Sequence, residues 1–181
     1  GSAAPSLIRG VAESLAGRTA FLELPGLRWG EVMDRSRASI ERLWLRGSYP
    51  DAWLARSDAD WWTWTESYVR AFVERDLPML GVDITPSRVR TVWAMLAHFS
   101  GQVWNASRLA SSLGVSYHTV NRHVDILEQA FIVRRLPPYH ANVGKRLVKS
   151  PKIYLRDTGV LHHFLGIHSK AELDVHPARG A

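Results

Sequence analysis

The sequence has 181 residues, of which 46% are apolar and 22% are charged, a composition that excludes a wholly disordered chain. It contains no cysteine, which excludes disulfides and thiolate metal sites and fits the reducing cytoplasm in which we expect the protein to reside. No run of about 18 apolar residues occurs, so a membrane is not an expected partner. The chain does not begin with Met, and we expect it to be a piece of a longer protein.

The first 32 residues predict mixed α/β structure. Leu7, Val11 and Leu15 lie four residues apart, which is typical of a helix. Residues 19–24 predict a short strand, and residues 29–39 predict a helix with a polar face. A parallel sheet needs several strand–helix units, and only one is visible in this stretch.

Residues 33–84 predict helices with a loop at residues 46–50. Ser57 can cap the clearest of these helices. Aromatic side chains recur at three- and four-residue steps between positions 61 and 72, which gives this helix one apolar face. Core packing is the expected role of the stripe, and a cofactor pocket is the alternative. Pro78 should stop the helix.

The next segment has the punctuation of a helix-turn-helix. Pro86 starts a helix, and Asn105 can cap a short one over residues 106–113. Gly114 follows at the helix end, where a positive φ is often needed, and Ser116 caps a third helix over residues 117–129. This order of short helix, glycine turn and capped helix is typical of the motif.

Two short strands are predicted after the third helix, over residues 131–136 and 152–155, with two prolines after the first strand. A hairpin in this place is the winged form of the motif. We therefore predict a mainly α fold with a small β hairpin, in which a winged helix-turn-helix at residues 85–157 follows a helical region.

Positive charge gathers on this hairpin. The net charge of the chain is +6, and residues 131–156 hold seven basic residues and no acid. Such a strip can attract a phosphate backbone; a solvated surface strip is the alternative. The expected nucleic-acid-binding residues, with duplex DNA as the expected partner, are His118, Thr119, Asn121, Arg122, Arg134, Arg135, Lys145, Arg146, Lys149 and Lys152.

The third helix also carries two acids, Asp125 and Glu128, which would repel phosphate if they faced it. We therefore expect phosphate contacts from the hairpin to contribute more to binding than base contacts from the helix. The alternative is a protein-docking or lid module that contacts no nucleic acid. The adjacent His162 and His163 point different ways on a helix, so we expect no metal site there. No catalytic residues and no GxxxxGK[ST] phosphate-binding loop are found, so no cofactor is expected in this chain.

Four runs of sequence resemble bacterial and archaeal AAA-type P-loop ATPases that carry the C-terminal domain of unknown function 4143 (DUF4143). They are LWLRGSYPDAW at 43–53, YVRAFVERDLPML at 68–80, NASRLASSLGVSYHTVNRHVDILEQAFIVRRLPP at 105–138 and KRLVKSPKIYLRDTGVLHHFLGI at 145–167.

The resemblance implies that residues 1–32 are the remnant of an ATPase core, 33–84 a helical connector, and 158–181 the start of the DUF4143 tail. It implies nucleotide-sensing roles for Ser2 and Arg18. ATP and Mg²⁺ are then expected for the full-length parent, and the missing P-loop core is an expected partner. A chain without that core is not expected to hydrolyse ATP.

Overall fold

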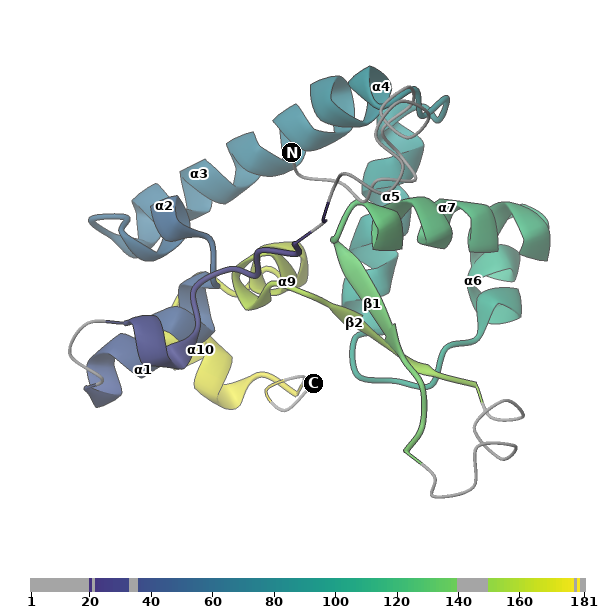
Figure 1. Cartoon of the computed structure of the whole chain (residues 1–181). Coiled ribbons are helices and arrows are strands. Elements are labelled where there is room, and N and C mark those ends of the chain that lie inside the picture. The colour runs from purple at the N-terminus through teal and green to yellow at the C-terminus, as the bar shows by residue number, and fades with distance from the viewer. Residues whose placement is uncertain (1–19, 21, 33–35, 140–149, 178, 180–181) are drawn as a thin grey trace. The chain divides into compact units, whose positions relative to one another are not determined.

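The computed structural model describes residues 20, 22–32, 36–139, 150–177 and 179. The fold is mainly helical with a two-stranded antiparallel sheet, as predicted (Figure 1). The chain divides into two compact units. We call Pro78–Arg156 the hairpin unit, and Leu15–Leu77 together with Asp157–Gly180 the helical unit. The chain passes from one unit to the other within a short helix, α4 (Leu77–Met79).

The helical unit is built from two segments that are far apart in the sequence. The first contributes η2 (Trp29–Glu31), α1 (Arg37–Arg46), α2 (Pro50–Trp53), α3 (Asp58–Ala71) and a π-helical turn, η3 (Phe72–Asp76). The second contributes α9 (Thr158–Leu165) and α10 (Lys170–Val175). Helix α9 packs against α1 and α3. The core of the helical unit includes Leu45, Trp61 and Ile167. The segment predicted as the start of a separate tail therefore completes this unit.

Asp157 joins the two segments. Its carboxylate accepts hydrogen bonds from the backbone N–H of Ser48 at 2.6 Å and from the Ser48 hydroxyl at 2.9 Å. It also caps α9 by accepting from the N–H of Val160 at 2.8 Å. Burial raises the pKa of Asp157, and these hydrogen bonds oppose that rise. Close backbone contact at Gly159 brings α9 against the end of α1, because a Cβ there would lie 2.0 Å from the carbonyl oxygen of Arg46.

The hairpin unit contains α5 (Pro86–His98), α6 (Ala106–Leu113) and α7 (Tyr117–Gln129), followed by β1 (Val133–Leu136) and β2 (Lys152–Leu155). The predicted caps are confirmed: Asn105 accepts from the N–H of Arg108, and Ser116 accepts from that of Thr119. Gly114 ends α6 with a φ of 63°. Apolar residues of all three helices and both strands, such as Trp93, Leu109 and Val124, form the core.

The sheet has a feature that the sequence did not predict. Between α5 and α6, Val103 forms an antiparallel bridge with Lys152. The N–H of Gly101 donates to the carbonyl of Ile153 at 2.7 Å, and the N–H of Trp104 donates to that of Pro151 at 2.7 Å. Strand β2 is therefore paired on both sides, with β1 along one edge and residues 101–104 along the other.

Two local predictions are wrong. The described residues of the expected strand at 19–24 form no strand, and Leu22 and Leu24 are both 93% exposed. No neighbouring strand pairs with them in the described part of the chain. The helix expected at 29–39 is instead η2 followed by α1, which begins only after its cap, Ser36. The helix expected to stop at Pro78 runs through η3 into α4 and ends at Met79, one residue past the proline, in agreement with the prediction.

Candidate functional site

Positive charge is concentrated in the hairpin unit. Residues 78–156 contain eleven Lys and Arg against three Asp and Glu, a net charge of +8, whereas the whole chain has +6. The rest of the chain is therefore net acidic. A local excess of this size attracts polyanions at short range, and the positions of the individual cations decide where one could bind.

The two acids of α7 are turned toward the hairpin and paired there. Arg135, on β1, donates from Nη2 to Asp125 Oδ1 at 2.6 Å and from Nε to Glu128 Oε2 at 2.7 Å. The Arg135 backbone N–H also donates to Glu128 at 2.8 Å. Burial acts to lower the pKa of Arg135, but the hydrogen bonds to the two carboxylates outweigh burial and raise it, so the guanidinium stays charged. Arg135 thus neutralises α7, a different role from the phosphate contact expected of it.

The expected residues of α7 have different surroundings. His118 and Arg122 are exposed on the outer side of the helix. Thr119 belongs to the cap, because its hydroxyl and the Ser116 hydroxyl are hydrogen bonded at 2.9 Å. Asn121 is half-buried and lines a cavity described below. Nearby, burial lowers the pKa of His123, as do the charges of Arg88 and Arg122, so His123 is neutral at pH 7.

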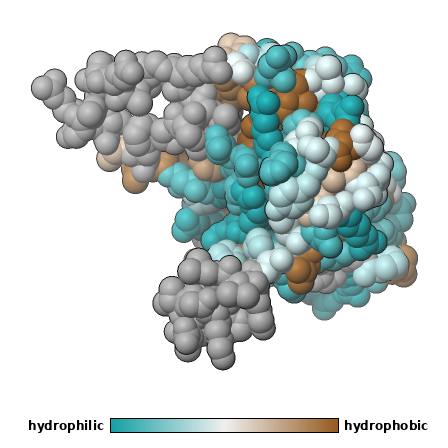
Figure 2. All heavy atoms as spheres, turned by 90° about the vertical axis from the view of Figure 1, so that its right-hand side faces the viewer, coloured by the Kyte–Doolittle hydropathy of each residue, from teal (hydrophilic) through white to brown (hydrophobic). Residues whose placement is uncertain are grey.

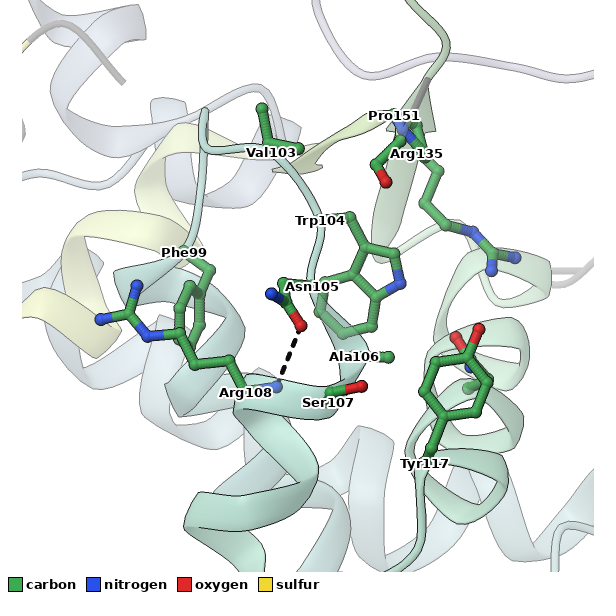
Figure 3. A pocket seen from close by; sticks show the side chains of 12 residues that line it. Phe99, Val103, Trp104, Asn105, Ala106, Ser107, Arg108, Tyr117, Arg135 and Pro151 are labelled. Carbon is green, nitrogen blue, oxygen red and sulfur yellow. Dashed lines mark hydrogen bonds between the residues drawn. The ribbon is translucent and has the colours of Figure 1, made fainter. Parts of the chain in front are cut away.

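An open cavity of about 630 Å³ lies between the start of α6, the start of α7 and the sheet. The side chains of Trp104, Tyr117 and Arg135 come from three different elements and point toward the same opening (Figure 3). Asn121 and Arg108 are among the other polar residues of its lining, and the Arg108 guanidinium lies 5.0 Å from the centre of the Phe99 ring. The cavity therefore combines hydrogen-bonding groups with flat aromatic surfaces.

The outer face of the hairpin is a second surface, separate from the cavity. The strand register pairs Arg134 with Tyr154 and Leu136 with Lys152, so these four side chains share one face. The opposite face carries Val133, which is buried, and Arg135. Arg134 and Lys152 are exposed and form no ion pair with any residue that the structure describes. A groove of about 750 Å³ runs over this outer face.

Apart from Thr119, which belongs to the cap of α7, the expected residues that the structure describes fall into three groups. His118 and Arg122 lie on the outer side of α7, Asn121 and Arg135 at the cavity, and Arg134 and Lys152 on the outer hairpin face. Five expected residues lie outside the described part of the chain: Ser2, Arg18, Lys145, Arg146 and Lys149.

Sequence reasoning missed Trp104, Arg108 and Tyr154, which line these surfaces. The alternation of side chains along β2 could have placed Tyr154 on the face of the strand away from the buried Ile153. Trp104 carries no comparable signal, because its position depends on the pairing of residues 101–104 with β2. Arg108 lies on α6, and the helix pattern does not reveal the Phe99 ring beside it.

The surface around α6 and α7 is mainly polar, with scattered apolar residues (Figure 2). None of the described helices has both the length and the apolar composition needed to cross a membrane. Within the described residues, no three His, Asp or Glu side chains are grouped in a way that could hold a metal ion. His162 and His163, in α9, are buried.

Comparison with known proteins corrects the resemblance drawn from the sequence. Residues 37–171 match the domain of unknown function DUF8612, and not DUF4143. The AAA-type ATPase resemblance is therefore wrong. The runs that suggested it, such as 43–53 and 105–138, lie within the DUF8612 match. The roles implied for Ser2 and Arg18, and the expected ATP and Mg²⁺, rested on that resemblance and lose this support.

The chain is 46% identical over its whole length to an uncharacterized protein of Mycobacterium tuberculosis and to one of Mycobacterium bovis. It spans 40% of the length of each of these relatives. No solved structure matches the chain.

Proposed function

We propose that this chain, which belongs to the DUF8612 family, binds nucleic acid through its hairpin unit, and that this unit is a winged helix-turn-helix. The order of elements supports the proposal. Two capped helices, α6 and α7, are joined by a three-residue turn and followed by a hairpin. The pairing of residues 101–104 with β2 holds the hairpin beside the helices. Helix α7 occupies the place of the helix that enters the major groove.

One observation carries the proposal: the acids of α7 are turned to the hairpin side, where Arg135 is hydrogen bonded to both carboxylates and offsets one of their two charges. Unpaired and facing the ligand, these two carboxylates would repel phosphate from the helix. With both carboxylates paired, the exposed side of α7 presents His118 and Arg122. An arginine can contact either a phosphate or the O6 and N7 atoms of guanine. The net charge of +8 in this unit adds a sequence-independent attraction to duplex DNA.

The residues of this unit differ in whether they contribute affinity or choice of sequence. Arg134 and Lys152, on the hairpin, can contact only the backbone of a duplex that α7 enters, and so add affinity for every sequence. Asn121 is half-buried at the cavity, where its amide can reach only a base edge that enters deeply. We therefore assign the greater part of the affinity to phosphate contacts, as the sequence led us to expect.

A salt titration tests the proposal. The chain is titrated into a fluorescein-labelled duplex and the dissociation constant is measured by anisotropy between about 50 mM and 200 mM NaCl. We expect affinity to fall steeply with salt, and Arg122→Ala to reduce the slope of log K against log salt by about 0.9. Arg37→Ala is the matched control, because Arg37 lies in the helical unit, is 91% exposed and removes the same charge.

Three results would contradict the proposal. The first is the absence of detectable duplex binding at the lowest salt concentration. The second is binding that does not weaken as salt rises, and the third is an equal loss of binding in Arg37→Ala and Arg122→Ala. Any of these results leaves the protein-docking module as the remaining interpretation of the hairpin unit.

A further inference from the structure

The groove on the outer hairpin face mixes aromatic, aliphatic and cationic side chains. Its lining includes Tyr154 on β2, Leu136 on β1 and Tyr139 just beyond β1. Leu136 is 42% exposed and Tyr139 is 89% exposed, and Val103 at the edge of the groove is 60% exposed. Apolar side chains that are exposed together on one face often mark a contact surface, whereas single exposed apolar residues do not.

The cations of this face are placed across the strands from one another. Arg134 lies opposite Tyr154, and Lys152 lies opposite Leu136, so Arg134 and Lys152 are diagonal neighbours at about 7–8 Å between their Cα atoms. None of the described residues that line the groove is acidic. The ligand that complements this face is therefore a polymer with negative charges at regular intervals and flat apolar groups between them.

We propose that this outer face binds a single-stranded stretch of nucleic acid. Bases stack on the rings of Tyr154 and Tyr139, and the phosphates between them lie against Arg134 and Lys152. Stacking on aromatic rings combined with a cationic track is the general way in which proteins hold unpaired strands without choosing a sequence. The two bonding modes are interleaved here on one pair of strands.

This site shares Arg134 and Lys152 with the phosphate contacts proposed for duplex DNA, and adds the rings of Tyr154 and Tyr139, which the duplex does not use. Arg135 and the acids of α7 lie on the inner side of the hairpin, whereas Tyr154 and Arg134 lie on its outer side. The inference rests on the proposed function in assuming a nucleic-acid ligand, but it assigns the stacking tyrosines of the outer face to an unpaired form of that ligand. A junction between duplex and single strand can then contact α7 with its duplex part and the two tyrosines with its unpaired part.

The test compares three labelled probes with the whole chain: a duplex, an oligothymidylate strand, and the duplex with an oligothymidylate tail. We expect the tailed duplex to bind more tightly than the plain duplex. Tyr154→Leu should weaken oligothymidylate binding by about 5-fold or more, which corresponds to the low end of the stacking contribution of one base. Tyr154→Phe, which keeps the ring, should bind like the wild type, and neither change should alter plain duplex binding.

A second variant guards against loss of folding. Tyr139→Ala changes a side chain that is 89% exposed, so it should leave thermal unfolding unchanged and still weaken oligothymidylate binding by about 5-fold. If plain duplex binding is intact but neither tyrosine variant affects oligothymidylate, the single-strand site is refuted and the proposed function stands. If oligothymidylate binds through the tyrosines but the duplex does not bind, the inference survives and the duplex surface is refuted. Tight binding of polyglutamate in place of oligothymidylate would assign the face to an acidic protein partner and refute the inference.

Discussion

Replacing each of the adjacent arginines of β1 separates a binding role from a structural one. Arg134 and Arg135 are indistinguishable in the sequence, but they lie on opposite faces of the hairpin. Arg134 is exposed and has no ion pair with a described residue, whereas the Arg135 side chain is 28% exposed and is bound to two carboxylates. The same substitution to alanine should therefore change nucleic-acid affinity at one position and stability at the next.

The magnitudes follow from these surroundings. Arg134→Ala should change the free energy of unfolding by less than about 0.5 kcal/mol. It should lower duplex affinity about 8-fold at 0.1 M salt, because one phosphate contact contributes about 0.9 to the salt slope. Arg135→Ala removes hydrogen bonds between charged groups that are partly screened by solvent, and leaves Asp125 and Glu128 unpaired one turn apart. We estimate a loss of about 2 kcal/mol, between the values for exposed and for buried charged pairs.

Two assays measure the contrast. For a unit of this size, about 2 kcal/mol corresponds to a fall in Tm of about 8–16 °C, which differential scanning calorimetry resolves. Salt titrations at a temperature where both variants are folded then compare affinity, and Arg135→Ala should cost less than about 3-fold at 0.15 M salt because screening weakens its distant field. A salt slope lowered by about 0.9 in Arg135→Ala, together with a Tm equal to that of the wild type, would show that Arg135 contacts phosphate and does not stabilise the fold through the acids of α7.

Three further predictions concern stability. Asp157→Ala removes the cap of α9 and the one oxygen that accepts from both the N–H and the hydroxyl of Ser48. It should destabilise the helical unit by about 2–4 kcal/mol in urea unfolding; a loss below about 1 kcal/mol would contradict the linking role of this carboxylate. Gly159→Ala should be at least as damaging, because its Cβ meets the backbone of Arg46, whereas Gly114→Ala, with open space but a φ of 63°, should cost only about 1 kcal/mol. Burial lowers the pKa of His162, whose ring is hydrogen bonded to the Leu45 carbonyl at 2.8 Å. The contribution of His162 to stability is therefore complete above about pH 6.5 and is lost as the pH falls below it. His162→Gln should make Tm less sensitive to a change from pH 7.5 to 5.5. An unchanged sensitivity would show that His162 is not the group responsible for the pH dependence.

Local signals predicted the helices of the hairpin unit well. The bounds of α6 and α7 follow from Asn105, Gly114 and Ser116, whose effects act within one helical turn and need no partner elsewhere in the chain. The strand expected at residues 19–24 had no such support. Alternating apolar residues such as Leu22 and Leu24 predict a strand only if a neighbour exists to pair with it, and a single sequence does not reveal that neighbour.

The site was predicted less completely for the same reason. Sequence alternation places Arg134 and Arg135 on opposite faces of β1, but it does not say which face meets the carboxylates of α7. That choice depends on how the hairpin packs on the helices. The pairing of residues 101–104 with β2 and the contact of Asp157 with Ser48 join positions far apart in the chain, and no local pattern marks either one.

The divided sequence of the helical unit has a consequence for its synthesis. During translation α1, α2 and α3 leave the ribosome first, but the surface that α9 covers stays open until Asp157–Gly180 has been made. The hairpin unit, whose Pro78–Arg156 segment is continuous, can fold during that interval. A chain stopped after Arg156 should therefore retain a protease-resistant hairpin unit while its first helices are digested, and resistance of both parts would show that α9 and α10 are dispensable for folding.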